Sequence, residues 1–120
     1  MLRLYGSAKS RAVRVLWMLG ELELKFDHKD WLPRAPETKT PEYLALNANA
    51  RVPTIDDDGF VLWESNVIVR YLAAKHGAGT LWPSDLRERA DAERWMDWAS
   101  FHVSVAMGPA FQKHVMKPLT

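Results

Sequence analysis

The chain has 120 residues, of which 48% are hydrophobic and 26% are charged, which is the balance of a globular protein and not of a disordered segment. Cysteine is absent, which excludes disulfides, thiolate metal sites, a CxxC redox centre and a nucleophilic thiol in this chain. The 16 basic residues nearly balance the 15 acidic ones, and there is no basic block, signal-peptide core or membrane-spanning apolar run, so we expect a cytoplasmic protein that binds neither nucleic acid nor membrane.

A short strand and an amphipathic helix open the chain. Residues Leu2–Tyr5 alternate between apolar and polar side chains and are followed by Gly6, which predicts a strand that ends there. From Ala12 onward the apolar side chains recur at the intervals of one helix face. Ser10 stands just before this helix, in the position of an N-cap.

A weak second strand, a loop and a short helix are predicted next. The strand is the segment Lys25–His28, and the prolines and charges of Trp31–Thr40 indicate a loop. Thr40 as a cap and Pro41 at the first helical position predict the start of a short helix. The segment Asn47–Arg51 has the composition of a turn.

A β-hairpin and a second amphipathic helix follow. The segments Val52–Ile55 and Phe60–Trp63 are predicted strands, and the Asp-Gly step within Asp56–Gly59 supplies the positive φ values of a tight hairpin. Apolar side chains at helical spacing then predict a helix with Ser65 as its N-cap and an end at Gly77.

The rest of the chain is predicted to be helical. Glycine and proline mark residues 78–84 as a linker between a first domain, residues 1–77, and a helical region, residues 85–120. A long helix begins at Asp85 and is expected to be interrupted at Gly108–Pro109.

This order of elements indicates an α/β fold. The succession βαβ-α-ββα forms a mixed four-stranded sheet with helices on its faces, which is a thioredoxin-like arrangement, and a partial all-α region follows. Redox thioredoxins carry a CxxC motif at the start of the first helix. In this chain that place holds Ser7-Ala8-Lys9-Ser10, which contains no cysteine.

Three motifs resemble those of the soluble glutathione transferases, in the same order and at fitting spacings. They are a strand followed by a hydroxyl-rich turn, a segment similar to the family pattern N-P-x-G-K-V-P-x-L, and a segment similar to E-S-x-A-I-x-x-Y-L. In this chain they lie at residues 4–15, 47–55 and 63–72. The resemblance points to a serine-type member, theta-, phi- or zeta-like or bacterial, with only the first helix region of a truncated helical second domain.

The resemblance implies an enzyme that binds glutathione as co-substrate, without a metal, and activates its thiol for attack on a hydrophobic electrophile. The free thiol has a pKa of about 8.5, and a hydroxyl donor at a helix N-terminus favours the charged form. Ser10 occupies the place at which serine-type members hold this hydroxyl. Ser7 and Tyr5 are the rivals, and Ser10 is also compatible with a simple helix cap.

The resemblance also implies the residues that bind glutathione. In this fold the Val52–Pro53 bond is cis, which leaves the backbone N–H and C=O of Val52 free to pair with the cysteinyl unit. Glu64 matches the ammonium group of the γ-glutamyl end, and Ser65 matches its carboxylate. Two further charged candidates, each also compatible with a solvated surface position, are Lys39 and Arg51.

The remaining features are assigned to the surface or to association. Lys9, Arg11 and Arg14 form a mildly basic patch that we expect to be solvated, and the histidines do not cluster as metal ligands would. Trp95 and Trp98 lie on one stripe of the long helix, so we expect a homodimer with this stripe in or near the contact. The alternatives are a glutathione-dependent isomerase, dehalogenase or peroxidase, and a non-catalytic interaction module with the same fold.

Overall fold

Residues 1–119 are described in the computed structural model, and they divide into two units between Leu81 and Trp82. The elements of the first unit are β1 (Leu2–Tyr5), α1 (Ala12–Glu21), β2 (Asp27–Lys29), η1 (Pro36–Lys39), α2 (Pro41–Leu46), β3 (Thr54–Asp57), β4 (Phe60–Trp63) and α3 (Ser65–His76). Those of the second unit are α4 (Leu86–Trp98), η2 (Ala99–Val103), α5 (Ser104–Phe111), η3 (Gln112–Met116) and α6 (Lys117–Leu119).

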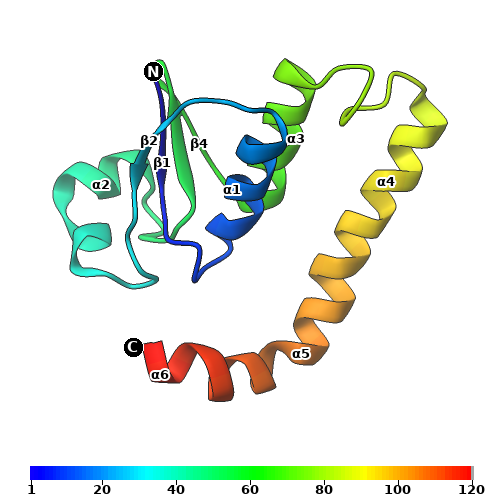
Figure 1. The fold of residues 1–120 in the computed structure, drawn as a ribbon. Coiled ribbons are helices and arrows are strands. Elements are labelled where there is room, and N and C mark those ends of the chain that lie inside the picture. The colour runs from blue at the N-terminus through cyan, green and yellow to red at the C-terminus, as the bar shows by residue number, and fades with distance from the viewer. Residues whose placement is uncertain (120) are drawn as a thin grey trace. The chain divides into compact units, whose positions relative to one another are not determined.

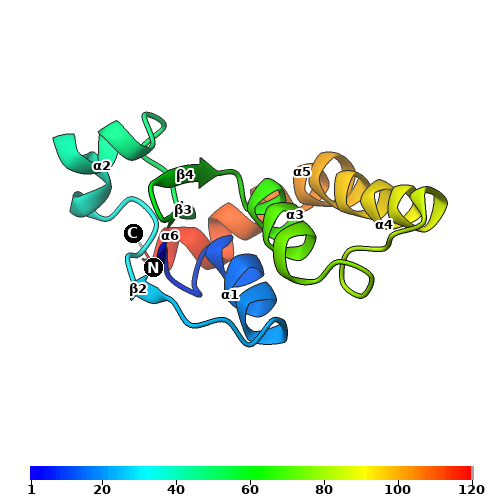
Figure 2. The ribbon, with the colours of Figure 1, turned by 90° about the horizontal axis from the view of Figure 1, so that it is seen from above.

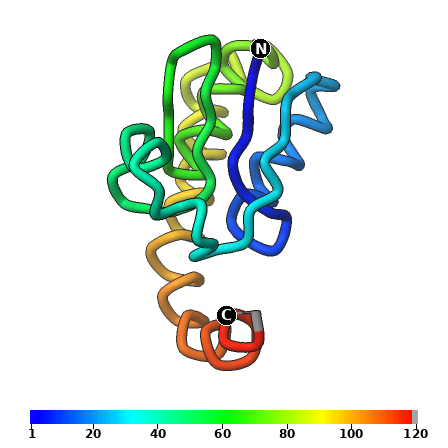
Figure 3. The backbone as a smooth tube through the Cα atoms, turned by 90° about the vertical axis from the view of Figure 1, so that its left-hand side faces the viewer, coloured from blue at the N-terminus to red at the C-terminus, as the bar shows by residue number. Residues whose placement is uncertain are grey.

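The first unit is built on a mixed four-stranded sheet with the strand order β2-β1-β3-β4. Strand β1 runs parallel to β2 and antiparallel to β3, and β3 and β4 form an antiparallel hairpin. In Figure 3 the dark-blue β1 lies between the light-blue β2 and the green hairpin. The predicted α/β class and the mixed thioredoxin-like sheet are confirmed.

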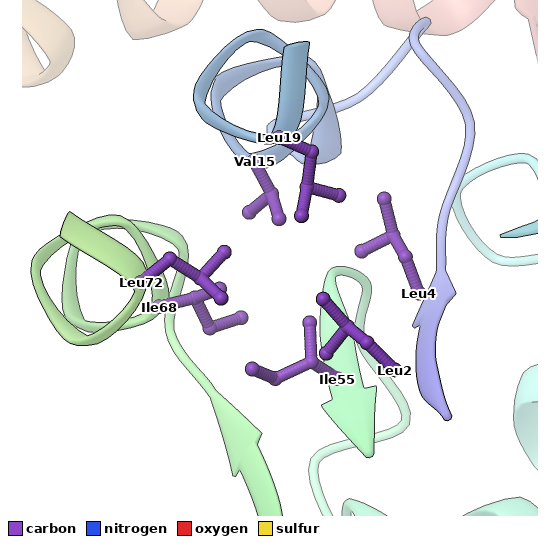
Figure 4. Close-up of a cluster of buried hydrophobic side chains, with 7 residues drawn as sticks. All are labelled: Leu2, Leu4, Val15, Leu19, Ile55, Ile68 and Leu72. Atoms are coloured by element: carbon purple, nitrogen blue, oxygen red, sulfur yellow. The ribbon is translucent and has the colours of Figure 1, made fainter. Parts of the chain in front are cut away.

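Helices α1 and α3 lie next to each other and cover one face of this sheet (Figure 2). The apolar spacing of α1 places Val15 and Leu19 against β1, where Leu4 is also fully buried. Burying a side chain of this size stabilises the fold by roughly 1.5–3 kcal/mol. Figure 4 shows the resulting core, which consists of Leu2, Leu4, Val15, Leu19, Ile55, Ile68 and Leu72.

Helix α2 covers the opposite face of the sheet (Figure 1). Its Tyr43 is only 1% exposed, and its ring centroid lies 5.4 Å from those of both Tyr5 and Trp31. As predicted, Thr40 caps this helix, because its hydroxyl oxygen accepts the N–H of Tyr43 at 3.3 Å. The three aromatic rings thus anchor α2 beside the loops that leave the sheet.

Three predictions of local structure in this unit are wrong. The second strand is Asp27–Lys29 and not Lys25–His28, because parallel pairing with β1 selects its residues. The third strand begins at Thr54 and not at Val52, because the intervening proline has no N–H for the ladder. The predicted loop after β2 also contains the 3₁₀ turn Pro36–Lys39.

The hairpin turn agrees with its prediction, because Asp58 and Gly59 have φ values of 51° and 93°. Next to this turn, the carboxylate of Asp57 accepts hydrogen bonds from the Tyr71 hydroxyl at 2.5 Å and from Lys75 Nζ at 2.6 Å. The Lys75 and Tyr71 hydrogen bonds lower the pKa of Asp57. They also tie this end of the hairpin to α3.

The second unit is a helical path that begins with a side-chain cap, since Asp85 accepts the N–H of Glu88 at 3.1 Å. The rings of Trp95 and Trp98 pair edge to face with centroids 5.6 Å apart. The predicted interruption at Pro109 is wrong, because this proline lies inside α5. The path instead turns between α4 and α6 (Figure 1), where the π-helical turns η2 and η3 flank α5, and such turns bend helices.

Candidate functional site

Three loops leave the sheet of the first unit at the same end. In the strand register Tyr5 lies opposite Thr54, and Thr54 lies opposite Trp63. Because these residues form one row across the sheet, the segments that adjoin them emerge side by side. These segments are Gly6–Ser7 after β1, Val52–Pro53 before β3 and Glu64–Ser65 after β4.

Gly6 allows the first two loops to approach closely. Its φ is 135°, and a Cβ at this position would lie 2.7 Å from the Cβ of Ala12 and 3.1 Å from the Cβ of Val52. Glycine is therefore required by both backbone conformation and space. The Gly6 carbonyl accepts a hydrogen bond from Nε2 of His28 at 2.8 Å, and its N–H donates to the Lys29 carbonyl at 2.9 Å. These contacts fix the start of α1 beside Val52.

Two serine hydroxyls lie in the turn that leads into α1. The Ser10 hydroxyl donates to the carbonyl of Ser7 at 2.7 Å and accepts the N–H of Ala12 at 3.1 Å. The prediction that Ser10 is the N-cap of α1 is nevertheless wrong, because Arg11 occupies that position and Ser10 lies one residue before it. The Ser7 hydroxyl is nearly buried and accepts the N–H of Lys9 at 3.2 Å. Within residues 1–119 it donates to no protein group, whereas the proton of Ser10 is already used.

The Val52–Pro53 bond is cis, as the resemblance implied. In the part of the chain that the structure describes, neither the N–H nor the C=O of Val52 forms a hydrogen bond with another residue. Val52 therefore offers one backbone donor and one backbone acceptor at the end of the sheet, next to the start of α1.

A buried polar network holds the residue before Val52. The Tyr43 hydroxyl donates to the carbonyl of Arg51 at 2.5 Å, and the side-chain amide of Asn47 donates to the same carbonyl at 3.1 Å. Because Tyr43 has given its only proton, the Thr54 hydroxyl donates to the Tyr43 oxygen across 2.8 Å and accepts from Asn47 at 3.0 Å. Burial raises the pKa of Tyr43. Sequence analysis missed this network, although Asn47 opens one of the motifs.

Helix α3 begins with an unusual backbone conformation. Glu64 has φ of 79° and ψ of 110°, and its carbonyl accepts the N–H of Ile68 at 2.9 Å. Ser65 is the first residue of the helix, so the prediction that Ser65 is the N-cap is wrong and Glu64 occupies that position. A positive φ in a residue other than glycine is a local strain that occurs in turns and at functional sites, and in this chain Glu64 is one of five such residues within residues 1–119.

Arg14 of α1 reaches the start of α3. Its Nη1 donates to the Ser65 hydroxyl and to Oδ1 of Asn66, each at 3.3 Å. Burial, and then the nearby charge of Arg11, lower the pKa of Arg14. The prediction that Arg14 belongs to a solvated patch is therefore wrong, because packing of α1 on α3 partly covers it.

The structure gathers some of the predicted site residues and leaves others apart. Four of them lie at the common end of the sheet, three on the loops and one as the first residue of α3: Ser10, Val52, Glu64 and Ser65. Two cations are exposed and form no ion pair within residues 1–119, namely Lys39, which is the last residue of η1, and Arg51. The ring of Tyr5 is nearly buried against Trp31 and Tyr43.

The described part of the chain has neither a group of metal ligands nor a helix that could span a membrane. Among residues 1–119, no three acidic, histidine or cysteine side chains are grouped as metal ligands would be. None of the helices in this part of the chain has the length and apolar character needed to cross a bilayer.

The common end of the sheet combines groups that can bind an anion with an unpaired backbone donor and acceptor. Two helix N-termini begin at this end of the sheet, and each presents backbone N–H groups and the positive end of its dipole. Arg14 adds a cation, and Val52 adds an unpaired backbone donor and acceptor. Such an arrangement can bind carboxylates and stabilise a negative charge that develops on a ligand.

Comparison with known proteins identifies the family. The model of the family described as "Glutathione S-transferase, N-terminal domain" matches residues 10–75. Glutathione S-transferase GstB of Escherichia coli strain K12 is 42% identical over 109 residues, which cover 88% of this chain and 52% of that protein.

Solved structures give the same result. The theta class glutathione S-transferase of Xanthomonas axonopodis pv. citri, determined with glutathione bound, has a TM-score of 0.85 and 38% identity over 92% of this chain and 54% of that chain. Glutathione transferase F7 of Populus trichocarpa has a TM-score of 0.84 and 31% identity over 99% of this chain and 58% of that chain. This chain therefore spans about half the length of these relatives. The matched segment includes most of the first unit and more than half of all residues, and the chain belongs to the glutathione S-transferase N-terminal domain family.

Proposed function

We propose that the first unit binds glutathione at the common end of its sheet and holds the thiol as a thiolate that attacks an electrophilic carbon. The observation that carries this proposal is the unpaired N–H and C=O of Val52, placed between the starts of α1 and α3. Glutathione is a short peptide with a carboxylate at each end, so it needs both the backbone pairing and the anion-binding helix ends.

In this proposal each part of glutathione has a protein partner. The cysteinyl unit pairs with the Val52 backbone as an added strand would. The γ-glutamyl carboxylate binds at the start of α3 with Ser65, and its ammonium group pairs with Glu64. The exposed cations Lys39 and Arg51 are the proposed partners of the glycine carboxylate.

The thiol is activated in the turn before α1. A hydrogen bond from a serine hydroxyl and the positive end of the helix both favour the thiolate, and a pKa lowered by about two units corresponds to about 2.7 kcal/mol. Ser10 is the donor that the family resemblance suggests. In the observed arrangement its proton goes to the Ser7 carbonyl, which supports Ser7 as the donor unless the Ser10 hydroxyl rotates when glutathione binds.

The properties of the whole protein belong to the same proposal. It is an enzyme of the cytoplasm that transfers glutathione to a hydrophobic electrophile and acts as a homodimer. Residues 1–77 form the glutathione-binding domain, residues 78–84 a linker, and residues 85–120 the first part of a helical domain that lines the electrophile pocket. The separation of the chain into two units between Leu81 and Trp82, inside this linker, supports the division.

Calorimetric titration with glutathione, followed by a conjugation assay with a generic aromatic halide, tests the proposal. Saturable binding together with conjugation would support a transferase. Binding without conjugation would support the glutathione site but not the transferase reaction, and isomerase, dehalogenase and peroxidase substrates would then be assayed. Absence of binding by a folded protein would contradict the proposal and favour the non-catalytic module.

A further inference from the structure

Arg14 is a partly buried cation for which the described part of the chain provides no anion. Its two hydrogen bonds go to neutral acceptors, the Ser65 hydroxyl and Oδ1 of Asn66, and both are 3.3 Å long. No carboxylate within residues 1–119 forms an ion pair with it. The charge of Arg11, the residue directly before the same helix, acts against the charged form of Arg14.

The surroundings of this guanidinium are electropositive in another respect. The acceptors that it contacts are the first two residues of α3, where the helix dipole is positive and the first N–H groups have no intrahelical partners. A partly buried charge is costly unless an opposite charge compensates it. Arg14 and the start of α3 together therefore favour a negative group that arrives from outside the chain.

We propose that Arg14 is a further glutathione-binding residue whose guanidinium pairs with the γ-glutamyl carboxylate while it holds the Ser65 hydroxyl toward the same group. The inference rests on the proposed function, because it names an additional partner for a ligand at that site. Two neutral hydrogen bonds of 3.3 Å leave the remaining N–H groups of the guanidinium available for an incoming carboxylate.

A different role would be purely structural. Arg14 could simply connect α1 to α3 through Ser65 and Asn66, in which case its loss would lower stability without changing how the protein recognises one particular ligand group. The two roles are separated by a pair of ligands that differ only in the γ-glutamyl carboxylate. These are glutathione and its decarboxylated analogue, 4-aminobutyryl-cysteinyl-glycine.

The experiment measures both ligands by calorimetry on the 120-residue chain, its Arg14→Gln variant and an Arg11→Gln control. The control removes the same charge from an exposed position directly before the same helix, where Arg11 has no contact with Ser65. We expect the unmodified chain to prefer glutathione over the analogue, and Arg14→Gln to lose about tenfold or more of that preference while binding the analogue almost equally well. Arg11→Gln should keep the preference.

Each outcome has a defined meaning. If Arg14→Gln, shown by circular dichroism to be folded, retains the full preference for glutathione, the inference about Arg14 is overturned while glutathione binding stands. If neither ligand binds the unmodified, folded chain, the proposed function itself fails. If Arg14→Gln does not fold, Arg14→Lys and Arg14→Met are compared instead, because lysine keeps the positive charge without the two-pronged geometry of arginine. An unchanged preference for glutathione in Arg14→Lys together with a lost preference in Arg14→Met would support a charge pair.

Discussion

Tyr43→Phe removes a single oxygen atom from the buried support of the Arg51–Val52 segment. That oxygen donates to the Arg51 carbonyl at 2.5 Å and accepts from the Thr54 hydroxyl at 2.8 Å. The ring remains, so its packing against the rings of Tyr5 and Trp31 is preserved. The Arg51 carbonyl also keeps the amide of Asn47 at 3.1 Å, so the segment is loosened and not released.

The expected magnitude follows from the two lost hydrogen bonds. Each contributes a net 0.5–1.5 kcal/mol in a typical case, so we expect the free energy of unfolding to fall by about 1–3 kcal/mol. A looser Val52 must be ordered again when glutathione binds, which lowers the affinity by roughly two- to tenfold. Urea unfolding measures the first quantity, and calorimetry measures the second.

Tyr71→Phe is the matched control. It removes a hydroxyl that donates to Asp57 at the other end of β3, far along the strand from Val52. This variant should also be less stable than the unmodified chain, but its affinity for glutathione should not change. If Tyr43→Phe is destabilised yet binds glutathione as tightly as Tyr71→Phe does, the network supports the fold alone and our account of how Val52 is positioned is refuted.

Three further predictions concern the start of α1 and the hairpin. Ser7→Ala should raise the pKa of the thiol of bound glutathione more than Ser10→Ala does, while the affinity for glutathione stays within a few-fold in both variants. Ultraviolet titration of the thiolate measures this pKa, and a larger rise in Ser10→Ala would assign the donor to Ser10. Gly6→Ala should lower the free energy of unfolding, measured by urea unfolding, by about 2 kcal/mol or more, because there is no space for the added Cβ and alanine rarely adopts the φ of Gly6. An unchanged midpoint of urea unfolding would contradict the tight packing of this loop. The pKa of Asp57 is lowered in the folded state, so its contribution to stability is complete above its unfolded pKa of about 3.9 and is lost as the pH falls through the folded value. Asp57→Asn should therefore flatten the acid side of a plot of the free energy of unfolding against pH. An unchanged acid side would argue against the ion pair between Asp57 and Lys75.

The elements that could be predicted from sequence depend on local signals. The apolar spacing of α1, the cap at Thr40 and the Asp58–Gly59 turn each act within a few residues, and the structure contains all three. The boundaries of β2 depend on its parallel pairing with β1, and no local pattern contains that information, whereas Pro53 was a local signal for the start of β3. The helical path through Pro109 likewise depends on the flanking π-helical turns.

The candidate site shows the same division. Val52 and Ser65 could be proposed from their motifs, because those motifs describe short segments of chain. The burial of Arg14 could not, since it results from packing between two helices that are about fifty residues apart in sequence. The positive φ of Glu64 could not be foreseen either, because that conformation is rare for residues other than glycine and leaves no mark on composition.

The central claim is tested most directly by ultraviolet titration of the glutathione thiol while the unmodified chain is saturated with glutathione, because this measurement observes the thiolate itself. If the sheet end binds glutathione beside the start of α1, the bound thiol should titrate about two units below its ordinary pKa of about 8.5. S-methylglutathione, which has no ionisable thiol, provides the baseline. A bound thiol that titrates at its ordinary pKa would show that the site holds glutathione without activating it, and would contradict the proposed reaction.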